Sequence, residues 1–140
     1  MHANITATRS NVSPDLNAKL LVACLCATWC GTCREYKDAF LSLVKIFPDA
    51  AFIWLDVDDD AELVGDLDVE NFPTILIQRD NAVLFFGVML PDHKQLKRLI
   101  QALDSQSDEE VESYIQSSAE RRVWQSDCDL RQRLRDMHRP

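Results

Sequence analysis

The first hydrophobic segment of the chain is KLLVACLCA, at residues 19–27, in which apolar and polar positions do not alternate. Such a segment is typical of a strand that is covered on both faces in the middle of a sheet. From Cys30 onward the apolar positions recur at helical spacing, until Pro48 and Asp49 end the pattern. This region therefore predicts a buried strand that leads directly into a helix.

The next segments continue the alternation of strand and helix. Residues 51–57, AFIWLDV, predict a second buried strand. The acidic residues 58–60 are placed to cap a short helix over residues 61–67, because carboxylates accept hydrogen bonds from the free N–H groups of a first turn.

Two further strands are predicted at residues 74–78 and 82–88, and the polar turn 79–81 between them makes them a hairpin. A helix is predicted to begin at Pro91, since proline lacks only an N–H that is unpaired in a first turn. Its buried face is expected to consist of Leu96, Leu99, Ile100 and Leu103.

The composition changes after Leu103. Residues 104–120 hold acidic but no basic residues, whereas residues 121–140 are rich in arginine. The apolar positions of this segment keep helical spacing: Val111, Ile115, Ala119, Val123, Leu130, Leu134 and Met137. We expect a domain over residues 1–103 and a helical extension over 104–140, which is either a solvated tail or a docking or dimerising element.

Charge and composition limit the partners. The net charge is -8, which argues against binding to nucleic acid or anionic lipid, because both require basic surface. No segment approaches the ~20 apolar residues that span a bilayer. The sequence Leu21–Cys24 resembles a lipoprotein cleavage site, but the polar residues before it do not form a signal peptide. We therefore expect a cytoplasmic protein.

Two of the five cysteines, Cys30 and Cys33, lie where the predicted strand gives way to the predicted helix. A helix N-terminus offers unpaired N–H groups and the positive end of the dipole, which stabilise a thiolate at Cys30. Cys33 lies one turn further in on the same face, so it can attack a mixed disulfide held on Cys30. Gly31 and Thr32 keep the connecting turn small.

The other cysteines allow alternative interpretations. A zinc site formed by Cys24, Cys26, Cys30 and Cys33 is disfavoured, because a buried strand cannot wrap around a metal, and we expect no metal. Cys24 and Cys26 are instead expected to be small buried thiols, and Cys128 an inert one. Residues 56–60 imitate the start of a calcium loop, but Ala61 replaces the glycine that such a loop requires.

The combination of Trp-Cys-Gly-x-Cys after a buried strand, the order of the elements, and Phe72-Pro73-Thr74 at the start of the hairpin resembles the thioredoxin family. The resemblance covers roughly residues 19–103, with residues 1–17 as a plausible first strand and helix. It implies an α/β fold, a thioredoxin-like three-layer α/β/α sandwich with a central mixed sheet, here followed by the helical extension.

The resemblance also implies roles for individual residues. Cys30 matches the attacking cysteine and Cys33 the resolving one, so the redox-active disulfide would be Cys30–Cys33, with no bound cofactor. Pro73 matches the family's cis-proline, which faces the cysteines. The positions implied in substrate binding are Trp29, Gly31, Thr32, Phe72, Pro73 and Thr74.

Several residues depart from the family pattern. Cys24 stands where thioredoxins bury the aspartate that helps to move the proton of the resolving thiol, and Trp54 stands where they usually carry the neighbouring lysine. Asp38 and Thr32 each replace a proline. The altered proton-relay positions predict slower deprotonation of Cys33.

These features lead to two hypotheses. The first is a thiol-disulfide oxidoreductase that reduces disulfide-containing client proteins and is itself reduced by an NADPH-dependent thioredoxin reductase. The alternative is a binding or adaptor module, in which the extension recruits a partner or forms a homodimer and the thiols are dispensable. The sequence favours the enzyme, because both cysteines, Trp29 and Pro73 are present together.

Overall fold

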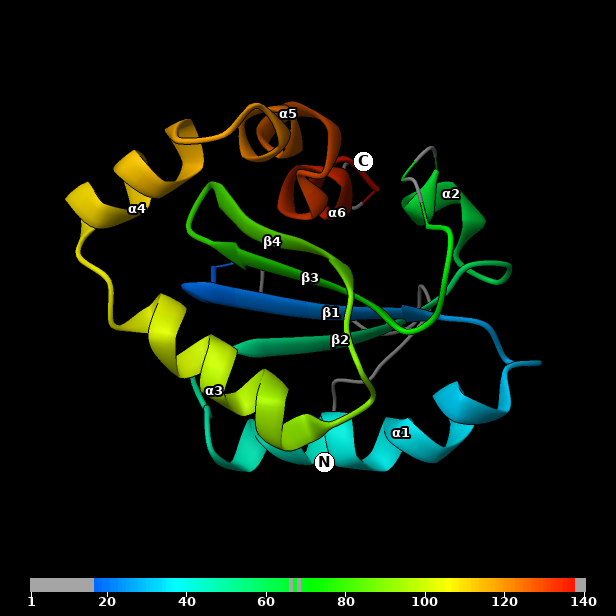
Figure 1. The fold of residues 1–140 in the computed structure, drawn as a ribbon. Coiled ribbons are helices and arrows are strands. Elements are labelled where there is room, and N and C mark those ends of the chain that lie inside the picture. The colour runs from blue at the N-terminus through cyan, green and yellow to red at the C-terminus, as the bar shows by residue number, and fades with distance from the viewer. Residues whose placement is uncertain (1–16, 66, 68, 138–140) are drawn as a thin grey trace.

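The computed structural model describes residues 17–65, 67 and 69–137, and these residues form a four-stranded mixed sheet with helices on both faces (Figure 1). The strands are β1 Leu20–Cys26, β2 Ala51–Asp56, β3 Thr74–Arg79 and β4 Ala82–Val88, in the order β2-β1-β3-β4. β1 runs parallel to β2 and antiparallel to β3, and β3 pairs antiparallel with β4. The predicted first strand and helix fall on residues 1–17, all but the last of which lie outside the described residues.

Helices cover the two faces of the sheet unequally. The helices are α1 Gly31–Ser42, α2 Ala61–Val64, α3 His93–Asp104, α4 Asp108–Gln116, α5 Ala119–Asp127 and α6 Leu130–Met137, and the 3-10 turn Leu43–Lys45 continues α1. In Figure 1, α1 and α3 lie below the sheet, whereas α2, α5 and α6 lie above it. The predicted three-layer α/β/α fold with a helical C-terminal extension is confirmed.

The central strand β1 shows why the sequence forms a sandwich. All seven of its residues are buried, and alternate side chains enter different cores. Val22, Cys24 and Cys26 belong to the core between the sheet and helices α1 and α3. Leu21 and Leu25 belong to the core on the opposite face of the sheet. Both faces must be apolar, which accounts for the lack of alternation in the sequence.

The bounds of two helices differ from the sequence predictions. α3 begins at His93 rather than Pro91, because Asp92 is the N-cap and its carboxylate accepts a hydrogen bond from the backbone N–H of Lys94 at 2.9 Å. α2 ends at Val64, and Gly65 follows with a positive φ of 56°. The predicted cap of this helix is wrong, since the Asp60 side chain accepts from the Asp56 N–H instead.

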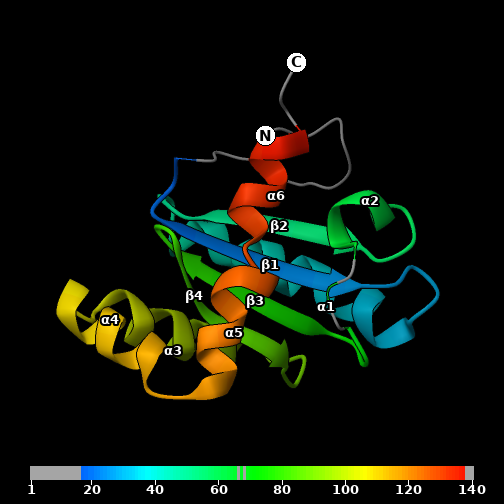
Figure 2. The same ribbon diagram turned by 90° about the horizontal axis from the view of Figure 1, so that it is seen from above.

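The C-terminal extension packs on its own domain. Cys128, Leu130 and Leu134 are buried on the sheet face opposite α1, and Figure 2 shows α6 lying across the sheet. The buried side chain of Gln78 links the two, because its amide donates to Asp129 at 2.6 Å and its carbonyl accepts from the Arg131 N–H at 3.0 Å. The extension therefore docks in cis, and the homodimer through it stays a prediction.

Within the described residues, the helices are all too short or too polar to cross a membrane.

Candidate functional site

The candidate thiol site lies at the short loop that connects the end of β1 to the start of α1. Cys26 is the last residue of β1, Cys30 is the N-cap of α1, and Cys33 is in the first turn of that helix. Cys33 is only 1% exposed, whereas Cys30 is half-buried and packs against the same core. The predicted strand-to-helix junction thus places one accessible cysteine beside one buried cysteine.

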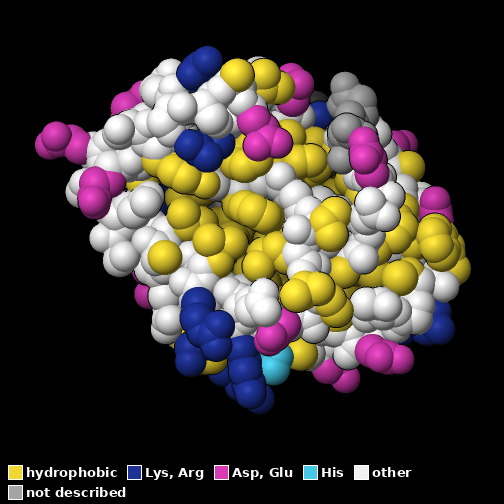
Figure 3. Space-filling view, viewed as in Figure 1, with side chains coloured by type: hydrophobic (Ala, Val, Ile, Leu, Met, Phe, Trp, Pro, Cys, Tyr) yellow, Lys and Arg dark blue, Asp and Glu magenta, His cyan; other side chains and the backbone are white. Residues whose placement is uncertain are grey.

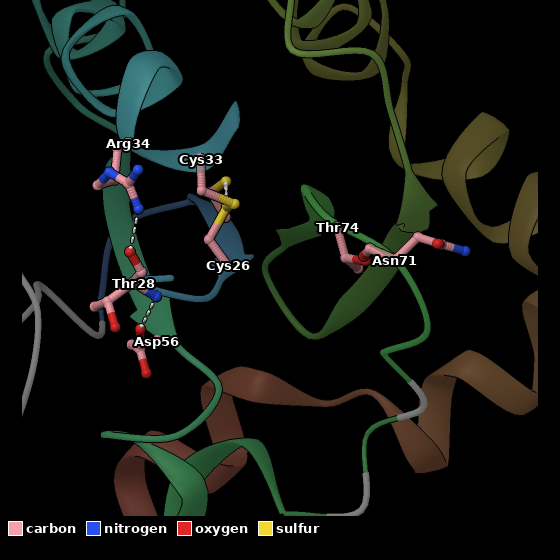
Figure 4. Close-up of a disulfide and its surroundings, with 8 residues drawn as sticks. Cys26, Thr28, Cys33, Arg34, Asp56, Asn71 and Thr74 are labelled. Carbon is pink, nitrogen blue, oxygen red and sulfur yellow. Dashed lines mark hydrogen bonds between the residues drawn. A yellow bond between two sulfur atoms is a disulfide. The ribbon is translucent and has the colours of Figure 1, made fainter. Parts of the chain in front are cut away.

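The structure contains a disulfide between Cys26 and Cys33 (Figure 4). Cys30 carries a free thiol. The predicted Cys30–Cys33 disulfide is therefore not the one present here, and the expectation that Cys26 is a simple buried thiol is wrong. The Cα atoms of Cys26 and Cys33 are 5.9 Å apart, because the short loop after β1 folds the first turn of α1 back against the end of the strand.

The altered proton-relay positions lie deep in the same core. Cys24 is fully buried, and its Sγ is 3.8 Å from the Sγ of Cys26. Trp54 pairs with Cys24 across the β1–β2 register, and its ring meets Phe40 edge-on at 5.8 Å. Burial raises the pKa of the Cys24 thiol far above its ordinary range, so this thiol stays protonated.

Tyr36, one of the buried residues of α1, is a second group that stays protonated. Its hydroxyl is buried and has no hydrogen-bond partner within the described part of the chain. Burial, and to a smaller degree the nearby Cys24 and Asp92, raises the pKa of this hydroxyl well above its ordinary value. Both side chains therefore remain neutral beside the cysteine cluster.

The loop that carries the active-site motif is held by Asp56 and Arg34. The buried Asp56 carboxylate accepts from the Thr28 N–H at 2.7 Å, and the Arg34 guanidinium donates to the Thr28 carbonyl at 2.8 Å (Figure 4). Asp56 also accepts from the N–H groups of Asp58 and Asp59, both at 2.8 Å. Sequence reasoning missed these roles, although Asp56 lies at the end of β2 in register with Cys26.

The exposed Trp29 and the half-buried Phe72 form an aromatic pair at the rim of the site. Trp29 is 67% exposed, its ring meets Phe72 edge-on at 5.5 Å, and its indole N–H donates to Asp58 at 3.2 Å. The Phe72–Pro73 peptide bond is cis, as the resemblance implies. Thr74 differs from these rim residues, because it is buried and its hydroxyl donates to the Asn71 carbonyl at 2.6 Å.

A groove of about 560 Å³ opens between the β3–β4 hairpin and the C-terminal extension. Its lining includes Asn71, Thr74, Val88, Val123 and Trp124. Figure 3 shows hydrophobic side chains gathered on the face between α3 and the C-terminal helices. The extension thus contributes surface close to the residues predicted to bind substrate.

No metal site was found in the part of the chain that the structure describes: it has no group of three or more His, Cys, Asp or Glu side chains that could hold an ion.

Comparison with known proteins agrees with this arrangement. The thioredoxin family model matches residues 4–105. A thioredoxin from Ophiophagus hannah is 37% identical over 78 residues, which cover 56% of this chain and 73% of that protein. Thioredoxin H2-2 of Oryza sativa subsp. japonica is 32% identical over 101 residues, covering 72% of this chain and 66% of that protein.

Solved structures show the same relationship. The germline-specific thioredoxin Deadhead of Drosophila melanogaster matches with a TM-score of 0.56 and 30% identity, over 63% of this chain and 84% of that one. The fold, the cysteine motif at the start of α1 and these relatives lead to one conclusion: the chain belongs to the thioredoxin family.

Proposed function

We propose that this protein reduces protein disulfides through Cys30 and Cys33. The observation that carries the proposal is the half-buried free thiol of Cys30 at the N-cap of α1, with Cys33 buried in the first turn behind it. A half-buried thiol at the start of a helix can be reached by an extended client segment.

The reaction proceeds in two exchanges. The Cys30 thiolate attacks a client disulfide R–S–S–R′, forms Cys30–S–S–R and releases R′ as a thiolate that takes up a proton. Cys33 then loses its proton and attacks the Cys30 sulfur, which forms the Cys30–Cys33 disulfide and releases R as the second thiolate. The client gains two electrons, and the protein loses two.

The surroundings of Cys30 favour an extended client segment. Trp29 supplies exposed apolar surface beside the half-buried Phe72, and the backbone next to Pro73 supplies hydrogen-bonding groups just before the start of β3. We place this reaction in the cytoplasm and assign re-reduction to an NADPH-dependent thioredoxin reductase.

Insulin reduction in the presence of dithiothreitol tests the proposal. Cys30→Ser should reduce the rate to that of dithiothreitol alone, because the attacking sulfur is lost. Cys128→Ser is the matched control, since Cys128 is buried on the opposite face of the sheet. Full activity in the Cys30→Ser variant would disprove the proposal. NADPH consumption with a thioredoxin reductase tests the proposed source of electrons.

A second candidate function is a binding module. It is favoured by the apolar groove that the extension forms with the hairpin, where Val88 and Val123 are more than half exposed. Under this hypothesis, a Cys30→Ser/Cys33→Ser variant retains its partners in co-purification while Val123→Asp loses them. Loss of partners on removing the two thiols supports the reductase instead.

A further inference from the structure

We propose that Cys26 is a third catalytic cysteine. It displaces Cys30 from the Cys30–Cys33 disulfide, so that a Cys26–Cys33 disulfide forms and Cys30 returns to the thiol form. The inference rests on the proposed reductase function and extends it by one intramolecular exchange. Its basis is the position of the Cys33 sulfur, which is bonded to Cys26 while Cys30 is free.

The fold places both partners of Cys33 within one short stretch of chain. Cys26 ends β1 with its side chain on the α1 side of the sheet, and Cys30 begins α1 only four residues later. The three cysteines contact the same core. Cys33 can therefore exchange one sulfur partner for the other without rearrangement of the sheet or of the body of α1.

The exchange needs no added oxidant or reductant. The Cys26 sulfur attacks the Cys33 sulfur of the Cys30–Cys33 disulfide, the Cys26–Cys33 bond forms, and Cys30 leaves as a thiolate. Cys26 loses one proton and Cys30 can take one up, so the number of disulfides and the total of bound protons are unchanged. The oxidising equivalents move from the accessible pair to a buried pair.

The buried Cys24 lies next to Cys26 and is placed to assist this exchange. Its thiol lies 3.8 Å from the Cys26 sulfur, within the range of a sulfur–sulfur hydrogen bond. Because burial raises the pKa of Cys24, the group remains a donor rather than a competing thiolate. A donor at this place stabilises negative charge on Cys26 whenever the Cys26–Cys33 bond opens or forms, which makes Cys24 a positioning residue.

The exchange changes what the oxidised protein can do. A Cys30–Cys33 disulfide leaves no free thiol in the motif, whereas the Cys26–Cys33 disulfide leaves Cys30 free and half-buried. The Cys26–Cys33 pair is also shielded, since Cys26 is 0% and Cys33 1% exposed. The oxidised protein can therefore form a mixed disulfide with a second client at Cys30.

Disulfide mapping of the whole protein tests the proposal. The reduced protein is oxidised with insulin, quenched in acid, alkylated and cleaved with chymotrypsin after Trp29, which separates Cys26 from Cys30 and Cys33. We expect a disulfide-linked pair of fragments and alkylated Cys30 in most oxidised molecules. A single fragment that contains the Cys30–Cys33 disulfide, with Cys26 alkylated, would overturn the inference.

Two variants keep this test independent of the reductase proposal. Cys26→Ser should lose alkylation at Cys30 in its oxidised form, because only the Cys30–Cys33 disulfide can then form. Cys24→Ser should retain the linked fragments but slow their appearance after oxidation. If only the Cys30–Cys33 disulfide is found and Cys30→Ser is inactive, the reductase proposal is supported and the role of Cys26 is refuted. If the linked fragments form when a chemical oxidant converts the thiols to disulfides, but insulin is not reduced, the reductase proposal is refuted.

Discussion

Removing the Asp56 carboxylate should loosen the active-site loop at a measurable cost in stability. This buried carboxylate accepts three backbone hydrogen bonds, from Thr28 at 2.7 Å and from Asp58 and Asp59 at 2.8 Å. A hydrogen bond to a charged group contributes about 1.5–3 kcal/mol when its donor is left unpaired. Thr28, Asp58 and Asp59 are all exposed residues, and each of the three hydrogen bonds is partly buried because the Asp56 carboxylate itself is buried.

We therefore expect Asp56→Ala to lower the free energy of unfolding by about 2–4 kcal/mol, because three partly buried hydrogen bonds are lost and water replaces each of them only in part. For a chain of this size, this corresponds to a fall in Tm of roughly 6–16 °C. Asp56→Asn should cost less, since the remaining amide oxygen can still accept from two of the donors. The insulin-reduction rate should fall with Asp56→Ala, because Trp29 and Cys30 follow directly after Thr28.

The assay is urea unfolding followed by far-UV circular dichroism, together with insulin reduction on the same samples. The exposed Asp49 provides the matched control, as Asp49→Asn removes a carboxylate far from the loop in the sequence. Equal stability and equal rates for Asp56→Ala and Asp49→Asn would refute the reasoning that this carboxylate fixes the loop.

Leu134→Ala should lower the free energy of unfolding by about 2–4 kcal/mol in urea titrations, because this residue is buried against the sheet, whereas Met137→Ala, at 45% exposed, should change it little. Tyr114→Phe should cost about 1 kcal/mol by losing its hydrogen bond at 3.0 Å, while Tyr36→Phe should be neutral or stabilising at pH 7, because its hydroxyl is buried without a described partner. The raised pKa of Tyr36 contributes stability below about pH 10 that is lost as pH rises, so Tyr36→Phe should flatten the decline of the urea midpoint in alkali. Gln125→Ala should increase light scattering on storage, because its amide makes two hydrogen bonds, both at 2.8 Å, to the outer edge of β4.

The C-terminal extension has a structural role that these variants probe. β4 lies at the edge of the sheet, where unpaired backbone groups invite another chain to pair. Gln125 binds both backbone groups of Val83, and the hydroxyl of Tyr114 donates to the carbonyl of Leu84. The extension therefore covers part of this edge while α6 covers one face of the sheet.

The sequence predicted the sheet and the central helices well because their signals are local. The apolar segments before Cys30 and before Asp58 coincide with β1 and β2, and the hairpin is formed by β3 and β4 as expected. Pro91 misled the prediction of α3, because Asp92 offers a side-chain acceptor that proline does not have. Local propensity identifies an element more reliably than its first residue.

The disulfide and the loop contacts depend on tertiary placement and could not be predicted from spacing. Helical spacing relates Cys33 to Cys30, but nothing in the sequence states that the last residue of β1 meets the first turn of α1. The contact from Asp56 to Thr28 spans 28 positions and requires the β1–β2 register. The helical extension was predicted from its periodicity, but its packing required the position of Gln78 beneath Asp129 and Arg131.

The most direct test of the account is to trap a client on Cys30. A Cys26→Ser/Cys33→Ser variant retains the attacking thiol but lacks both cysteines that can displace the client. Incubation of the reduced variant with one equivalent of a peptide that contains a disulfide, followed by mass spectrometry, should show one mixed disulfide located at Cys30. Under the same conditions the reduced unmodified protein should not accumulate this adduct, because its Cys33 displaces the client. If no adduct forms at Cys30 in the folded variant, the claim that this residue attacks client disulfides is contradicted.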